Sequence, residues 1–153
     1  MNASIKESLV IQLTLIISIG LFTFSLSQEC FCTGSNCGGS WSGLAILFSG
    51  ALGFYLCPAG FTWLANPAIL IAWTFIRKNP KRSLSASIIA FLLAISFLFF
   101  PNIVSDESGN MRQITAYHLG YWFWLASMLS VLSGNLIVYF QARSLISHNN
   151  QAY

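Results

Sequence analysis

Four long stretches of the chain are apolar and contain no Asp, Glu, Lys or Arg: residues 9–26, 43–76, 84–100 and 121–140. Runs of about 17 to 25 such residues match a hydrocarbon layer about 30 Å thick, because a helix rises about 1.5 Å per residue. The pattern predicts an all-α membrane protein. Its expected form is a four-span helical bundle, with residues 1–153 as a single membrane-embedded domain.

The second stretch is too long for one straight span, since as a continuous helix it would measure roughly 51 Å. It contains Cys57-Pro58-Ala59-Gly60 and Asn66-Pro67, and proline interrupts a helix. We therefore expect a broken or re-entrant second segment, with the break near residues 57–60 and the true span over residues 61–76. In a rival arrangement both halves cross the membrane, which gives five spans and places the N-terminus outside.

Charge predicts the orientation. Only 7% of the residues are charged, against about 25% in soluble domains. Six of the seven basic residues fall on one side of the four-span arrangement: Lys6, Arg77, Lys78, Lys81, Arg82 and Arg143. Basic residues near short loops stay in the cytoplasm, so we expect both termini there, in a multi-pass protein of the bacterial inner (cell) membrane. The net charge of +3 follows from this basic side and requires no nucleic-acid partner.

The first stretch also fits a cleaved signal peptide, with Lys6 as its basic region and Ser25-Leu26-Ser27 as its cleavage site. Its apolar run exceeds the usual signal-peptide core of about 7 to 15 residues, which favours a retained span. Both alternatives place residues 28–42 outside the cell.

Small residues recur at every fourth position in three segments. The stripes are Ala45, Ser49, Gly53 and Cys57; Ala86, Ala90 and Ala94; and Ala126, Ser130 and Gly134. Residues at this spacing share one helix face and allow close helix packing. The stripes predict a compact bundle, and they leave open a homo-oligomer that uses one of these faces.

Four cysteines are disulfide candidates: Cys30, Cys32, Cys37 and Cys57. An oxidising outer compartment favours disulfides, and four cysteines allow three full pairings. We expect Cys37 to pair with Cys30 or Cys32, with Cys30 preferred, and we leave open a further bridge to Cys57. The alternative is a soft-metal site of the loop cysteines with His118; a thiol oxidoreductase usually has a C-x-x-C motif, which this sequence lacks.

Within the spans, the most polar candidates are Asn66 and Asn135. Counted from the basic residues that follow them, they lie at similar depth, so we expect an interhelical hydrogen bond between the two amides. A substrate-binding role is the weaker alternative. Because no span carries a charge, proton-coupled transport is not expected, and no catalytic residue, cofactor or metal is predicted.

Two phrases carry a resemblance: Phe61-Thr62-Trp63-Leu64-Ala65-Asn66-Pro67 and Gly120-Tyr121-Trp122-Phe123-Trp124-Leu125-Ala126-Ser127-Met128. They resemble phrases of uncharacterised small bacterial polytopic inner-membrane proteins, which have no assigned activity. The resemblance implies a bacterial four-span protein and transfers no functional residues. The chain differs from DsbB-like quinone-dependent oxidases, because residues 101–120 contain no cysteine.

These observations favour a non-enzymatic inner-membrane protein that acts through protein–protein contacts within the lipid bilayer. An immunity or exclusion factor against a membrane-targeted toxin or phage, or an accessory subunit, would fit. The alternative is a membrane protein that handles thiol redox chemistry or a soft metal through its outer cysteine loop.

Overall fold

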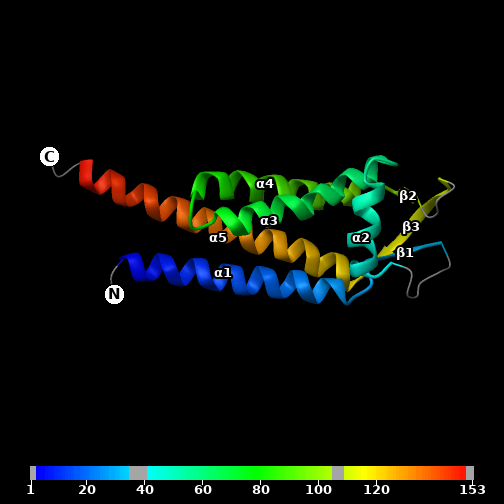
Figure 1. The fold of residues 1–153 in the computed structure, drawn as a ribbon, viewed down its shortest axis with the longest axis horizontal. Coiled ribbons are helices and arrows are strands. Elements are labelled where there is room, and N and C mark those ends of the chain that lie inside the picture. The colour runs from blue at the N-terminus through cyan, green and yellow to red at the C-terminus, as the bar shows by residue number, and fades with distance from the viewer. Residues whose placement is uncertain (1–2, 35–40, 105–108, 151–153) are drawn as a thin grey trace.

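The computed structural model describes residues 3–34, 41–104 and 109–150. Its helices are α1 (Ala3–Leu26), α2 (Gly43–Gly53), α3 (Ala65–Phe75), α4 (Pro80–Ser96) and α5 (Leu119–Asn150). Two 3-10 helices are η1 (Pro58–Leu64) and η2 (Phe97–Phe99). Helices α1, α3, α4 and α5 run side by side as a bundle, and α2 lies across one end of it (Figure 1).

Three helical segments are long and apolar enough to cross a membrane: Glu7–Leu26, Pro80–Phe99 and Leu119–Gln141. A fourth span is available if the bent pair Gly43–Gly53 and Pro58–Phe75 counts as one broken span. The charge-free stretches thus predicted the membrane-compatible helices. Helix α5 is longer than expected, since it continues beyond residue 140 to Asn150.

The predicted break in the second segment is confirmed. Helix α2 and the segment Pro58–Phe75 meet at 109°. The backbone of Cys57 is extended, with φ −149° and ψ 158°, as expected for a residue before proline. Pro67 causes no second break because it lies in the first turn of α3, where a missing N–H breaks no helical hydrogen bond.

The five-span rival does not match this arrangement. In that rival, α2 would have to run along the bundle as a separate span. Instead this 11-residue helix lies across the bundle end (Figure 1). The first turn of α1 and the last turn of α5 lie at the same end of the bundle (Figure 1). Between these two helix ends the chain therefore runs along the bundle four times, in α1, α3, α4 and α5 (Figure 1).

A small antiparallel sheet covers the end that α2 crosses. Its strands are β1 (Phe31–Thr33), β2 (Asn102–Val104) and β3 (Met111–Tyr117), in the order β1-β3-β2. The all-α expectation was wrong here, because both loops at this end contain strands. Strands β1 and β2 have three residues each, too few to show an alternating pattern in the sequence.

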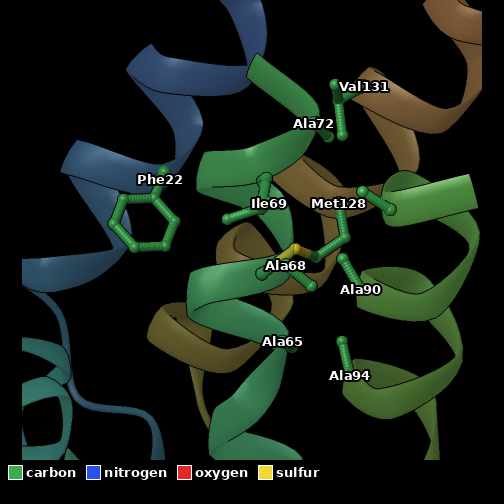
Figure 2. Packing of buried hydrophobic residues seen from close by; sticks show 10 residues of the cluster. Phe22, Ala65, Ala68, Ile69, Ala72, Ala90, Ala94, Met128 and Val131 are labelled. Carbon is green, nitrogen blue, oxygen red and sulfur yellow. The ribbon is translucent and has the colours of Figure 1, made fainter. Parts of the chain in front are cut away.

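The bundle core is built around small side chains (Figure 2). Ala68 and Ala72 of α3 and Ala90 and Ala94 of α4 belong to one buried cluster, which Met128 of α5 joins. Alanine allows neighbouring backbones to approach closely. The expected stripe of α4 therefore does face another helix.

The other two stripes behave differently from each other. A Cβ on Gly134 would collide with the side chain of Thr14, so α5 approaches α1 closely at this point. On α2, by contrast, Ala45 and Ser49 are exposed, and the nearest atom to a Cβ on Gly53 would be Leu56 Cδ1 at 3.4 Å. The expectation that the α2 stripe packs against a helix is wrong, because α2 lies across the bundle end.

Candidate functional site: a cavity beneath α2

A cavity of about 460 Å³ lies at the sheet-covered end of the bundle. Its walls come from α2, η1, the start of α3, the strands β1 and β2, and the first turns of α5. Small-molecule sites commonly enclose about 300 to 1,000 Å³. The cavity is therefore large enough for a small molecule or part of a lipid chain.

Aromatic side chains form much of the wall: Phe31, Trp41, Phe54, Trp63, Phe97, Tyr121 and Trp124. Several stack on one another; the ring centroids of Phe31 and Phe97 are 5.5 Å apart, and those of Phe97 and Tyr121 are 5.7 Å apart. None of the described lining residues is Asp, Glu, Lys, Arg or His. The cavity suits an uncharged, largely apolar occupant.

Helix α2 is fixed over the cavity by Trp63. The indole Nε1 of Trp63 donates a hydrogen bond to the backbone oxygen of Leu47 at 2.9 Å. A Cβ on Gly50 would collide with the ring of Trp63. Glycine at this position therefore lets α2 lie directly on the indole, and the pair closes one side of the cavity.

Asn66 presents a polar group at this wall. Its side chain is 7% exposed and lines the cavity. Its Oδ1 accepts a hydrogen bond from Trp124 Nε1 at 2.9 Å. Because the indole N–H can only donate, the amide atom that faces it is the oxygen, and Nδ2 points the other way.

The Nδ2 group of Asn66 donates no hydrogen bond within the described residues. Every fully buried side-chain nitrogen or oxygen among the described residues has a partner, so Nδ2 is not sealed inside the protein. Asn66 is almost wholly buried, and it is one of the residues that line the cavity.

Two thiols also line the cavity. Cys30 and Cys57 are both free, so the expected bridge between Cys30 and Cys37, and a bridge to Cys57, are not formed. Cys32 is disulfide-bonded, and Cys37 lies outside the described residues. The pairing of β1 with β3 places Cys32 opposite Ala116. The spacing of the cysteines in the sequence does not reveal this position.

Burial raises the pKa of the Cys30 thiol from 9.0 to about 12. A thiol with so high a pKa stays protonated at neutral pH, and the thiolate is the form that reacts with disulfides and metals. Cys30 is thus poorly suited to redox chemistry in this environment.

His118 meets the cysteine segment across the sheet. Its Nε2 lies 2.8 Å from Cys32 Sγ, and its backbone N–H donates to the oxygen of Cys30 at 2.9 Å. Within the described residues no three His, Cys, Asp or Glu side chains are grouped to hold a metal ion. Of the side chains considered for a soft-metal site, the described residues therefore bring two into contact, those of Cys32 and His118.

Asn135 is far from the cavity. Its Oδ1 lies 2.8 Å from Ser83 Oγ on α4, and its Nδ2 donates to the backbone oxygen of Ser83 at 3.4 Å. Asn66 bonds instead to Trp124, which precedes Asn135 by 11 positions on α5, or about 16 Å. The two amides each bond to another helix but not to each other, because Asn66 lies level with Trp124 on α5 rather than with Asn135.

No protein-family model, curated protein or solved structure matches this chain. The resemblance to small bacterial inner-membrane proteins stays a prediction. The cavity and its polar groups are the features that bear on function.

Proposed function

We propose that this protein is a non-enzymatic multi-pass protein of the bacterial inner membrane that holds one apolar molecule from the bilayer in the cavity beneath α2. The observation that carries the proposal is the cavity itself, about 460 Å³ in volume, with no charged side chain among the described residues that line it. Pockets of this kind, apolar with a few placed polar groups, are typical ligand sites.

The surroundings of the cavity support a ligand that comes from the membrane. Helix α2 exposes Leu44, Phe48 and Leu52, which are 51%, 68% and 80% accessible. Side chains of this kind on a helix across the bundle end suit burial at the boundary between headgroups and acyl chains. An apolar molecule can then reach the cavity without passing through water.

The basic residues support an outward-facing cavity. Arg77 and Lys78 lie in the turn between α3 and α4, and Lys81 lies at the start of α4; this turn lies away from the sheet (Figure 1). If these residues are cytoplasmic, the sheet and the cavity belong to the outer half of the membrane.

The protein-contact role inferred from the sequence stays a prediction. Apolar side chains on the outside of the bundle are also what lipid contact requires, so they do not favour a toxin, phage or subunit partner. The thiol alternative is weaker, since burial raises the pKa of Cys30 to about 12.

Filling the cavity tests the proposal. Ile46 lines the cavity, whereas Leu44, also on α2, does not line it and is 51% exposed. The protein is purified in detergent, stripped of lipid and titrated with phosphatidylethanolamine, and native mass spectrometry measures the fraction that retains one lipid. We expect Ile46→Trp to reduce retention at least about tenfold and Leu44→Trp to leave it unchanged. Equal retention in both variants would refute a ligand in this cavity.

A further inference from the structure

We infer that Asn66 selects a ligand with a carbonyl oxygen, and that the Nδ2 group donates a hydrogen bond to this oxygen; the inference rests on the proposed ligand-binding function. The acceptor chemistry is that of an acyl ester in a phospholipid or a ring carbonyl in an isoprenoid quinone. Both are molecules of the bilayer that join a long apolar part to an uncharged acceptor oxygen.

The hydrogen bond from Trp124 prepares Asn66 for this role. Trp124 Nε1 occupies the Oδ1 atom at 2.9 Å, which leaves two N–H donors on Nδ2. A donor among apolar walls is costly unless it finds an acceptor. A ligand carbonyl would supply that acceptor, whereas a pure hydrocarbon would leave the donor unpaired.

The position of Asn66 suits an ester carbonyl. It belongs to the first turn of α3, and Trp124 and Tyr121 belong to the first turns of α5 near the sheet. Trp and Tyr concentrate at the membrane interface, at the level of the headgroups. The ester groups of a phospholipid lie at the inner edge of this region, so one carbonyl can approach Asn66 while its acyl chain lies along the aromatic wall.

The absence of charge in the described lining restricts which part of a lipid enters. A phosphate group would lose its water without gaining an opposite charge, which is strongly unfavourable. The headgroup therefore stays outside, and recognition depends on the carbonyl and the chain. We expect little selectivity among headgroups.

The test compares a diacyl phosphatidylethanolamine with its dialkyl ether analogue, which has the same headgroup and chains but no ester carbonyl. Native mass spectrometry of the lipid-stripped protein gives the ratio of the two dissociation constants. We expect the wild-type protein to prefer the ester by about fivefold, as one net hydrogen bond would produce. Asn66→Leu should bring the ratio near one.

Asn135→Leu is the matched control. Asn66→Leu and Asn135→Leu each remove a buried amide that hydrogen-bonds to another helix, but Asn135 is not among the described residues that line the cavity. The ester preference should survive Asn135→Leu. Loss of the preference in both variants to the same degree would attribute it to lost packing rather than to the Nδ2 donor and overturn the inference.

An isoprenoid quinone and the hydrocarbon of the same isoprenoid tail form the second arm. A preference for the quinone that Asn66→Leu removes, together with an ester-to-ether ratio of one in the wild type, would assign the carbonyl to a quinone. If the wild type shows neither preference while Ile46→Trp still blocks binding, the ligand site stands and the inference about Asn66 fails. If Ile46→Trp blocks no binding, the proposed function itself fails.

Discussion

His118 lies against Cys32 across the sheet, with 2.8 Å between Nε2 and Sγ, although 86 positions separate the two residues in the chain. The loop after α1 and the loop before α5 are therefore one structural unit. The backbone hydrogen bond from His118 to Cys30 adds a second tie between them.

The oxidation states of the cysteines give the first prediction. Cys30 and Cys57 are free thiols, whereas Cys32 is disulfide-bonded. Alkylation in denaturant without reductant should modify Cys30 and Cys57, and Cys32 should become reactive only after reduction. A peptide map of the non-reduced protein identifies the partner of Cys32. A peptide that links Cys30 to Cys37 would contradict the structure.

The reactivity of Cys30 should depend on pH in an unusual way. Burial raises its pKa from 9.0 to about 12, and the thiolate is the reactive form. In a Cys57→Ser protein at pH 8, iodoacetamide should modify native Cys30 at least about 100-fold more slowly than the unfolded chain. The native rate should keep rising up to about pH 12. A native rate that levels off near pH 9 would mean that Cys30 is solvated.

The same shift affects stability. The unfolded thiol loses its proton near pH 9 while the folded thiol keeps it, so the folded state is disfavoured as pH rises between about 9 and 12. The contribution is fully present below pH 9, and Cys30→Ala should weaken the pH dependence of the unfolding midpoint in this range.

The proposed orientation predicts which surface positions can be labelled from outside. Met111 on β3 is 58% exposed, and Lys81 is exposed at the start of α4. In a Cys30→Ser, Cys57→Ser background, an impermeant maleimide should label Met111→Cys in intact cells but label Lys81→Cys only after permeabilisation. The reverse pattern would place the sheet in the cytoplasm.

Two glycines of α2 give a matched pair for packing. A Cβ on Gly50 would collide with the Trp63 ring, whereas Gly53 has only Leu56 Cδ1 within 4 Å. Gly50→Leu should lower stability by about 1 to 3 kcal/mol through overpacking. Gly53→Leu should be neutral or slightly stabilising, since leucine favours a helix more than glycine does. Thermal unfolding in detergent measures both; equal destabilisation would mean that α2 does not rest on Trp63.

The partner of Asn135 can be tested with a double-mutant cycle. Ser83→Ala and Asn135→Leu should be coupled by about 0.6 to 1 kcal/mol, as typical for interhelical hydrogen bonds in membranes. The cycle of Asn66→Leu with Asn135→Leu should show no coupling beyond error, because the two amides bond to different partners. Coupling in the second cycle and none in the first would support the pairing expected from the sequence.

The spans and the break before Pro58 could be predicted because each depends on local information. A charge-free run and a proline act on the residues next to them. Strand β3 was missed because its exposed and half-buried positions do not alternate regularly, and β1 and β2 were too short to show a pattern. Their pairing joins Phe31 to Tyr117, which no local pattern indicates.

The candidate site was only partly visible for the same reason. Asn66 and Asn135 stood out as polar residues in apolar surroundings, but their partners depend on how α3, α4 and α5 are aligned. The hydroxyl of Ser18 on α1 was missed entirely, although it accepts from Trp73 Nε1 at 3.0 Å and donates to the oxygen of Ser127 at 2.8 Å. Serine is too common in apolar stretches to indicate such a role on its own.

The pairing of β1 with β3 can form only late in the synthesis of the chain. During synthesis the nascent chain presents Phe31 long before its partner Tyr117, and α1 packs mainly against α5, which is made after α2, α3 and α4. Contacts so distant in sequence form late. Tyr121 and Trp124 also supply part of the cavity wall, so the cavity is complete only when the start of α5 has been made and has packed against the rest of the bundle.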